Sequence, residues 1–247
     1  MASGDFDSSA VQSGLRVLGV LGGVGSGKST AARILAEELP AKHLDADAEV
    51  ATLFADPGVV EKIDQACGGG LMSPKGALDR AELGKRVFAQ PELRRQLETI
   101  LHPAVRRALW TGLAETETAA LATGSAAAAS KLRGWAILDV PLLLENGLSQ
   151  ACDFLIFVRV PDAIRAERAC ARHNWELATW RAREAAQASL AQKQSAADAT
   201  LDNASGVEDL RAAVRELLPR LRALPPRSLR DRWPDSEQSP VATDPNA

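Results

Sequence analysis

The chain has 247 residues, of which 46% are hydrophobic, enough for one sizeable core with small satellite subdomains. Its 29 basic and 32 acidic residues give a formal net charge of −3, which speaks against broad affinity for nucleic acid or membranes. No apolar run approaches the roughly 20 residues of a membrane span, and three widely spaced cysteines indicate reduced thiols, so we expect a cytoplasmic protein. Residues 1–14 are small, polar and acidic, and we expect them to form a disordered leader.

The first ordered element is expected at residues 15–21, an apolar and branched segment of strand length. It leads into Gly-Gly-Val-Gly-Ser-Gly-Lys-Ser-Thr at residues 22–30, which matches the phosphate-loop pattern G-x-x-x-x-G-K-[ST]. A helix is expected to follow, with apolar residues at helical spacing up to Leu39 and a stop at Pro40. This order places the loop at a helix N-terminus, where the macrodipole favours anions. The context therefore favours nucleotide binding over an ordinary glycine turn with a surface lysine.

The residues of this loop have separate expected roles. Glycines allow backbone conformations in which N–H groups point at phosphate oxygens. Lys28 is a candidate catalytic residue that places a charge at the β- and γ-phosphates, and Ser29 is the candidate Mg²⁺ ligand. The candidate nucleotide-binding residues of the loop are Gly22, Gly23, Val24, Gly25, Ser26, Gly27, Lys28, Ser29 and Thr30.

A short second strand is expected at residues 41–45, followed by Ala46 and Asp47. Because ligands of parallel sheets bind outside the carboxyl ends of the strands, Asp45 and Asp47 would face the nucleotide crevice. The alternative is that one of them only caps a helix over residues 48–54, since aspartate is a favoured N-cap. For Asp45 alone the two interpretations compete, whereas for the pair we favour a functional role.

Consecutive helices without an intervening strand predict a helical insertion beside the sheet. They are expected at residues 59–66, 80–89, 91–101 and 103–116. His102 precedes a proline and is therefore pushed out of helical geometry, so we expect His102-Pro103 to interrupt the last two helices. The pattern alone leaves His102 as a hydrogen-bonded structural residue.

Three further strands are expected at residues 135–140, 154–160 and 199–203. Asp139 near the end of the first of them is typical of a Walker B strand, whose acid supports Mg²⁺, but an ordinary strand-end residue explains it equally well. Strands that alternate with helices, and a first turn that binds phosphate, predict an α/β fold with a doubly wound parallel sheet.

The helix expected at residues 162–172 carries three arginines at three- and four-residue spacing, and they therefore share one face. They are Arg165, Arg168 and Arg172. Beside a triphosphate their planar forks would suit phosphate oxygens, although a solvated face is the ordinary alternative. Residues 176–194 are helical and polar, as expected for a mobile lid or for any exposed helix.

An amphipathic helix is expected at residues 207–221. Residues 222–247 form a disordered tail in this interpretation, because the segment from Pro225 onward is proline-rich, polar and almost free of apolar residues. Removal of residues 225–247 is accordingly expected to leave stability nearly unchanged.

In this order the motifs resemble the dephospho-CoA kinase family over roughly residues 15–221. The phosphate loop is shared by many families, and the later elements are more specific. The resemblance rests on the loop, Asp45-Ala46-Asp47, Leu101-His102-Pro103, Val140-Pro141-Leu142-Leu143-Leu144-Glu145, Arg168 and Arg172, and Gln187, Lys193, Asp198 and Asp202-Asn203. Leu21 and Leu144 depart from it, since the family usually has threonine and phenylalanine there.

The resemblance implies a P-loop kinase fold with a five-stranded sheet, a helical acceptor-binding insertion at about 58–118 and a lid at about 172–194. It implies transfer of the γ-phosphoryl group of ATP to the 3′-hydroxyl of the ribose of dephospho-CoA, with Mg²⁺, in the last step of coenzyme A synthesis. By position, Asp47 matches the catalytic base and Arg168 an arginine near the transferred phosphate. Arg172 joins the nucleotide-binding residues. The acceptor-binding candidates are Asp45, Arg80 and His102.

Three other functions are alternatives at this point. Another small-molecule or nucleotide kinase would share the loop, the insertion and the lid. A nucleotide-dependent switch is disfavoured because the sequence lacks an Asn-Lys-x-Asp element, and a motor-type ATPase because Val140 stands where a glutamate is needed. The expected partners are ATP and dephospho-CoA, without nucleic acid or membrane, and the expected state is a monomer or weak homo-oligomer.

Overall fold

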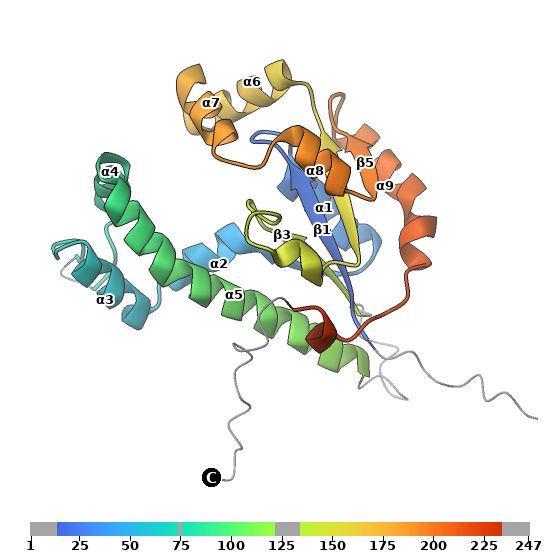
Figure 1. Cartoon of the computed structure of the whole chain (residues 1–247), viewed down its shortest axis with the longest axis horizontal. Coiled ribbons are helices and arrows are strands. Elements are labelled where there is room, and N and C mark those ends of the chain that lie inside the picture. The colour runs from blue at the N-terminus through green and yellow to red at the C-terminus, as the bar shows by residue number, and fades with distance from the viewer. Residues whose placement is uncertain (1–13, 74–75, 122–133, 234–247) are drawn as a thin grey trace, which may run out of the picture. The chain divides into compact units, whose positions relative to one another are not determined.

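The structure is a computed structural model, and it describes residues 14–73, 76–121 and 134–233 (Figure 1). The described residues divide into two compact units, the first comprising 14–43 and 113–233 and the second 44–112. Apart from Gly14, the expected disordered leader lies outside the described residues, as do the last residues of the expected tail.

The first unit is built on a five-stranded sheet in the order β2-β3-β1-β4-β5. The central strand β1 pairs in parallel with β3 and β4, and β4 pairs in parallel with β5. The bounds are β1 Arg16–Gly22, β2 Lys42–Asp45, β3 Trp135–Asp139, β4 Phe154–Arg159 and β5 Ala199–Asp202. The predicted doubly wound parallel sheet of a P-loop kinase fold is therefore confirmed.

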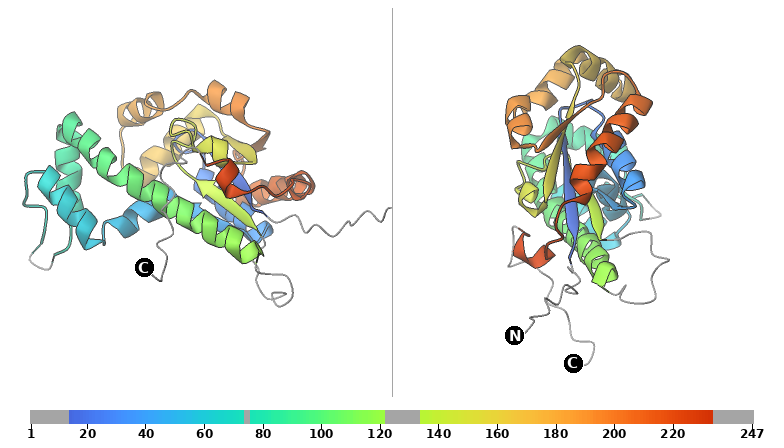
Figure 2. Two further views of the ribbon diagram at one scale, coloured as in Figure 1. Left: turned by 60° about the horizontal axis from the view of Figure 1, so that its bottom comes forward. Right: turned by 90° about the vertical axis from the view of Figure 1, so that its right-hand side faces the viewer.

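Alternate residues of the strands enter different layers, because successive side chains of a strand point to opposite faces. Leu18 and Val20 of β1 join a core with the helices α1 (Lys28–Glu38) and α9 (Val207–Arg222). The other strand and helix residues of this core include Ile34, Leu35, Ile137, Ile156, Val158, Leu210, Val214 and Leu221. Gly19 points the other way, since a Cβ there would lie 2.6–2.7 Å from the side chains of Leu143, Cys152 and Leu155. Helices accordingly lie on both sides of the sheet (Figure 2).

The second unit is helical, as predicted for the insertion, and has a small core of its own. Its helices are α2 Ala46–Leu53, α3 Pro57–Ala66, α4 Arg80–Ala89 and the first part of α5 Pro91–Leu121. Aspartates cap three of them: Asp45 caps α2, Asp56 accepts a hydrogen bond from Val59 N at 3.0 Å, and Asp79 accepts one from Glu82 N at 2.9 Å. The core comprises Val60, Ile63, Leu71, Leu78, Leu83 and Leu101.

The expected interruption at His102-Pro103 is wrong, because α5 runs through both residues. A proline inside a helix removes one hydrogen bond, here the one to the carbonyl of Thr99. Leu93 and Leu101 before the proline and Leu109 after it are all buried. Their burial on both sides of the proline offsets the lost hydrogen bond and keeps the helix continuous.

The expected disorder from residue 222 onward is wrong as far as Trp233. Arg227 pairs with Leu15 through two backbone hydrogen bonds of 3.0 Å, just ahead of β1. The short helix η2 (Leu229–Asp231) follows, and its Leu229 side chain is fully buried. The segment is ordered by backbone pairing and a few buried groups, which a count of apolar residues does not detect. Removal of residues 225–247 is therefore expected to destabilise the protein.

Arg232 fixes this C-terminal segment to the sheet. Its side chain is 1% exposed, forms an ion pair with Asp153 and donates a hydrogen bond of 2.7 Å to the carbonyl of Leu15. Asp153 also accepts a hydrogen bond of 2.7 Å from Val17 N of β1. The buried carboxylate of Asp153 thus links Arg232 of the C-terminal segment to the start of the central strand β1.

Replacing Arg232 by glutamine is expected to destabilise the protein strongly, since it leaves Asp153 buried without its closest cation. Loss of one partner of a buried ion pair costs about 3–5 kcal/mol, or a melting temperature lower by roughly 10 °C. The matched control is Arg230→Gln, because Arg230 lies two residues away and is exposed. Equal melting temperatures for the two variants in calorimetry would contradict the role given to Arg232.

Candidate active site

The phosphate loop joins β1 to α1 and is enclosed by two other parts of the first unit. Gly25 and Gly27 both have φ near 84°, a conformation that favours glycine. A Cβ at Gly25 would lie 2.2 Å from the carbonyl oxygen of Arg165, and one at Gly27 would lie 2.4 Å from Nδ2 of Asn203. Asn203 also donates a hydrogen bond of 2.9 Å to the carbonyl of Ser26. The glycines are therefore required by the close approach of neighbouring segments.

The first turn of α1 is suited to an anion. Its N-cap residue is Gly27, which has no side chain to accept from the first amides, and the turn contains no acidic residue. The first N–H groups of a helix have no carbonyl partner within it, and the macrodipole adds a partial positive charge. These amides therefore produce a positive electrostatic potential in the space in front of the loop.

Lys28 lies over this loop and donates hydrogen bonds to the carbonyls of Gly22 at 3.2 Å and Gly23 at 3.1 Å. Burial, and after it the nearby charge of Lys193, lower the pKa of its ammonium to about 8, whereas Asp139 and Glu184 oppose the shift. The charge of Lys28 is thus only partly compensated, which favours an incoming polyphosphate.

Lys193 is a second buried ammonium, carried by α8 (Leu190–Ala196) and 2% exposed. It donates a hydrogen bond of 2.6 Å to Oε1 of Gln187 and lies 3.7 Å from a carboxylate oxygen of Glu145. Burial lowers its pKa, and Glu145 and Glu184 oppose this shift. The expected lid region therefore contributes a cation near Lys28.

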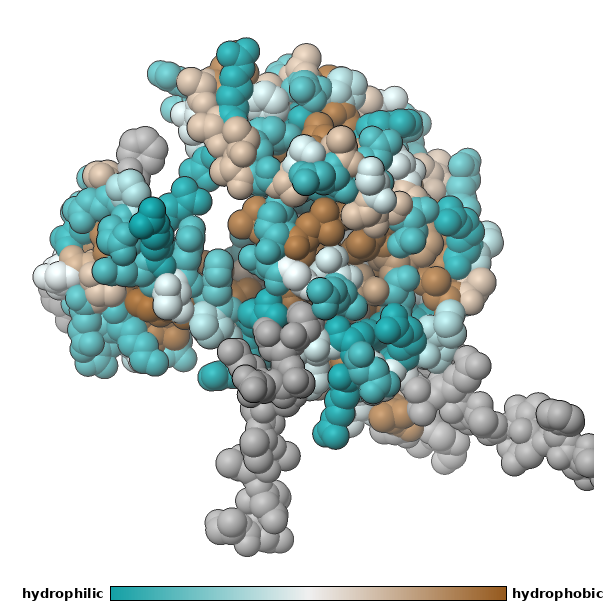
Figure 3. All heavy atoms as spheres, in the orientation of Figure 1, coloured by the Kyte–Doolittle hydropathy of each residue, from teal (hydrophilic) through white to brown (hydrophobic). Residues whose placement is uncertain are grey.

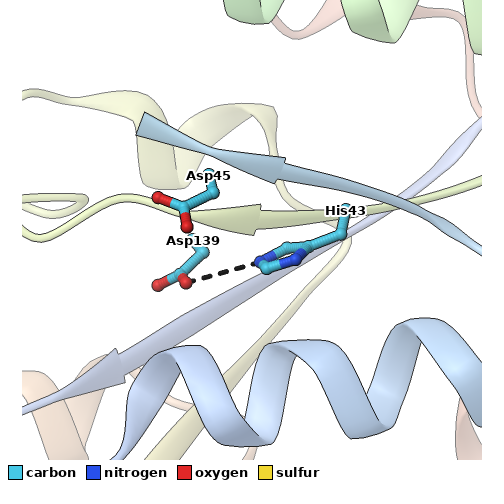
Figure 4. Close-up of side chains that lie close together, drawn as sticks. All are labelled: His43, Asp45 and Asp139. Atoms are coloured by element: carbon cyan, nitrogen blue, oxygen red, sulfur yellow. Dashed lines mark hydrogen bonds and ion pairs between the residues drawn. The ribbon is translucent and has the colours of Figure 1, made fainter. Parts of the chain in front are cut away.

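Three side chains that could hold a metal ion lie at the carboxyl ends of β2 and β3 (Figure 4). Nε2 of His43 is 3.4 Å from Oδ2 of Asp139, and one ligand atom from each of His43, Asp45 and Asp139 lies within 4.8 Å of the others. Sequence analysis left Asp139 open and did not consider His43. The sequence feature that indicates His43 is its spacing from Asp45: the two residues are two positions apart in a strand and therefore share a face.

Asp45 caps α2, as one of the two interpretations predicted. Its Oδ1 accepts from the amides of Asp47 at 2.9 Å and Ala48 at 3.2 Å. A carboxylate has a second oxygen, so the cap does not prevent Asp45 from taking part in the group with His43 and Asp139. Asp47 lies in the first turn of α2, and its side chain is exposed.

The three arginines of α6 (Asp162–His173) have different environments. Arg165 is 1% exposed and donates to Glu184 Oε1 at 2.7 Å and to Asp162 Oδ1 at 2.8 Å. Arg168 is half-buried and donates to the carbonyl of Asn203 at 2.8 Å, whereas Arg172 is exposed. Their spacing predicted a shared face but not which arginine is buried, so Arg165 received no role of its own.

Two of the three acceptor candidates, Arg80 and His102, are exposed. Arg80 donates a hydrogen bond of 3.0 Å to the carbonyl of Ala51, and its guanidinium carbon lies 5.2 Å from the ring centroid of Phe54. His102 lies on α5 with an exposed side chain. Arg80 is therefore positioned within the helical unit, while its own planar fork keeps further donors for a ligand.

The surface is mixed in character. On the face shown in Figure 3, hydrophilic residues surround the apolar ones. Among the described residues, the large apolar side chains that are exposed come from four separate segments, at Met72, Leu121, Leu177 and Val207. None of the helices in the described residues combines the length and apolar character needed to cross a membrane.

Nucleotide binding is expected to weaken as the pH rises through 8. In the free protein Lys28 loses its proton near this pH, whereas a bound phosphate favours the ammonium. The affinity for ADP is therefore expected to fall roughly tenfold between pH 7 and pH 9. Calorimetric titrations across this range measure it, and the control is Lys28→Arg, whose guanidinium stays protonated. A wild-type affinity that changes no more with pH than that of the arginine variant would refute the assignment.

Comparisons with known proteins show the family to which the chain belongs. A model of the dephospho-CoA kinase family matches residues 16–209. A dephospho-CoA kinase of Anaeromyxobacter dehalogenans is 39% identical over 209 residues, covering 84% of this chain and 93% of that protein. One from Deinococcus radiodurans is 37% identical over 206 residues, covering 82% of this chain and 92% of that protein.

Two solved structures are also similar. The TT1252 protein of Thermus thermophilus has a TM-score of 0.64 and 30% identity, covering 84% of this chain and 98% of that one. The dephospho-CoA kinase from Campylobacter jejuni has a TM-score of 0.57 and 21% identity, covering 83% and 97%, a likeness of fold alone. The match to the family model and the identity with the two relatives over most of both chains show that this protein belongs to the dephospho-CoA kinase family.

Proposed function

We propose that this chain transfers the γ-phosphoryl group of ATP to the 3′-hydroxyl of the ribose of dephospho-CoA. The products are coenzyme A and ADP, and the reaction is the last step of coenzyme A synthesis. The observation that carries the proposal is the uncapped first turn of α1 with Lys28 over the phosphate loop, in a chain 39% identical to a dephospho-CoA kinase.

Phosphoryl transfer depends mainly on positioning and on stabilising the charge of the transferred group. Lys28 and the loop amides would hold the triphosphate, with Lys28 exchanging its two carbonyl partners for phosphate oxygens. Arg168 is supported as a group near the transferred phosphate, because the carbonyls of Asn203 and Ala204 orient its guanidinium and engage two of its five donors. Arg172 is exposed in the last turn of α6 and would add charge at the nucleotide.

The acceptor hydroxyl requires a group that takes its proton. Asp47 is our candidate base, with an exposed carboxylate in the first turn of α2. Asp45, by contrast, holds the start of this helix with its Oδ1. Arg80 and His102 are the candidate groups for the remainder of dephospho-CoA, whose phosphates suit an arginine fork.

The residues present fit a divalent cation such as Mg²⁺. Mg²⁺ prefers oxygen ligands and is held by one or two carboxylates together with substrate phosphates. Asp139 is 3% exposed beside Asp45, and Ser29 lies at the loop, so these three side chains would hold the ion, with His43 next to them. When bound, Mg²⁺ supplies positive charge at the β- and γ-phosphates.

We further infer that α7 (Leu177–Ala185) and α8 form the lid expected at residues 172–194, which would exclude water from the transferred group. A cytoplasmic location and a monomeric or weakly homo-oligomeric state complete the proposal. The cysteines, which are all free thiols, support a reducing compartment.

Turnover of ATP is expected to depend on dephospho-CoA and to stop with its 3′-deoxy analogue, which lacks the accepting hydroxyl. Asp47→Asn is expected to lower this turnover by up to about 10²–10⁴-fold without changing the melting temperature, since it removes proton acceptance but little volume. Steady-state kinetics with both acceptors, together with melting curves, measure these effects.

The matched control is Asp45→Asn. Asparagine is itself a good N-cap, so this variant is expected to keep its melting temperature and to lose less turnover than Asp47→Asn. Equal turnover with and without an acceptor hydroxyl would refute the proposed reaction. If Asp47→Asn is fully active and Asp45→Asn is folded but inactive, the base is Asp45 and not Asp47.

A further inference from the structure

Both backbone polar groups of the loop residue Val24 are bound by side chains of α7. The amide of Val24 donates a hydrogen bond of 2.8 Å to Oε2 of Glu184. The carbonyl of Val24 accepts one of 3.2 Å from the indole Nε1 of Trp180. Glu184 and Trp180 are four residues apart and therefore lie on the same face of α7. The loop is thus held by a helix more than 150 residues further along the chain.

Arg165 joins these contacts into one group, which we call the Val24 clamp: Val24, Arg165, Trp180 and Glu184. Its Nη1 donates to Glu184 Oε1 at 2.7 Å and to the carbonyl of Val24 at 3.3 Å. Its guanidinium carbon also lies 5.3 Å from the ring centroid of Trp180, within the range of a cation–π contact. The carboxylate of Glu184 therefore bridges a buried guanidinium and a phosphate-loop amide.

The two charged groups of the clamp, the guanidinium of Arg165 and the carboxylate of Glu184, stabilise each other. The side chain of Arg165 is 2% exposed and that of Glu184 is 21% exposed, whereas the other carboxylate on Arg165, Asp162, is 75% exposed. A buried charge is costly unless it is paired and hydrogen-bonded. Glu184 is thus the main partner that allows Arg165 to lie beneath the loop, and this pairing fixes Glu184 against Val24.

We propose that Glu184 is a positioning residue, which, through the Val24 clamp, holds the phosphate loop in its nucleotide-binding shape before nucleotide arrives. Glycines at positions 22, 23, 25 and 27 give the free loop a large conformational entropy. The apparent affinity of a ligand is reduced by the fraction of protein in the competent state. A clamp that raises this fraction therefore tightens nucleotide binding without touching the nucleotide.

A competing interpretation is that the carboxylate of Glu184 occupies the loop as an anion and opposes phosphate. Two observations argue against it. Glu184 binds the amide of Val24, which precedes the first turn of α1, where the amides suited to phosphate lie. Its charge is also neutralised by Arg165 at 2.7 Å. The two interpretations predict opposite changes in nucleotide affinity.

The test is Glu184→Gln in the full chain, with ADP as the probe. A glutamine whose oxygen accepts from Val24 turns its amino group towards the donors of Arg165, so one of the two bonds is lost. The Kd for ADP in calorimetry is expected to rise about 5- to 50-fold, while kcat at saturating ATP changes less than twofold. In the free protein, the indole N–H resonance of Trp180 is expected to shift, since its acceptor, the carbonyl of Val24, is held less firmly.

The matched control is Glu176→Gln, because Glu176 is exposed at the start of the same helix and its side chain makes no capping hydrogen bond. Its Kd and indole resonance are expected to equal those of the wild type. Trp180→Phe removes the indole donor and some ring volume but keeps the pairing of Glu184 with Arg165, so a two- to fivefold rise in Kd is expected even if Glu184→Gln does not fold.

An unchanged Kd in the folded variants would overturn the proposal. A tighter Kd in Glu184→Gln would make Glu184 a competing anion, and a lower kcat with unchanged Kd would make it a transition-state group. The inference rests on the proposed function only through nucleotide binding. Failure of the wild type to bind ADP would refute that function, whereas equal binding by wild type and variants would refute the clamp.

Discussion

The backbone of the phosphate loop approaches its neighbours so closely that no side chain fits at Gly25 or Gly27. The neighbours are the carbonyl of Arg165 on α6 and the amide of Asn203 just after β5. Because β4 leads into α6 and pairs with β5, the sheet order carries both groups to the same end of β1. The parallel sheet is therefore what gives the loop its shape, and the function depends on that shape.

The close approach of neighbouring segments to the phosphate loop also places the charged side chains around it. Lys28, Arg165 and Lys193 are cations of limited exposure around one loop, and each has oxygen partners within the protein. Arg168 is linked to the loop indirectly, since it donates to the carbonyl of Asn203 while the side-chain amide of Asn203 holds Ser26. A triphosphate would thus enter a site whose positive groups are already oriented, which lowers the cost of positioning them for transfer.

Sequence reasoning was most successful where local pattern and physical requirement coincide. The strand, loop and helix at residues 16–38 were predicted because an apolar run, a glycine motif and helical periodicity follow one another. The capping role of Asp45 was also recognised as an alternative, since it follows from residue type and position. The family assignment and the five-stranded parallel sheet were confirmed on the same basis.

The misses share one cause, which is that they depend on contacts between distant segments. Spacing placed three arginines on one face but could not show that Arg165, rather than Arg168, is buried against Glu184. Low apolar content suggested disorder after residue 221, yet Arg232 is buried by pairing with Asp153, 79 positions away. His102-Pro103 was expected to separate two helices, but buried leucines on both sides keep α5 continuous. Composition and periodicity contain none of this information.

Residue-resolved amide hydrogen exchange, with and without ATP and Mg²⁺, tests most directly whether the protein shapes the loop before nucleotide binds. The amides of Val24 and Ser26 already have acceptors in Glu184 and the carbonyl of Gly23, so we predict slow exchange in both states. The amides of Gly27, Lys28 and Ser29, at the start of α1, are predicted to gain protection only with nucleotide. Rapid exchange at Val24 and Ser26 in the free protein, with protection of the whole loop on binding, would contradict this account and assign the shaping of the loop to the ligand.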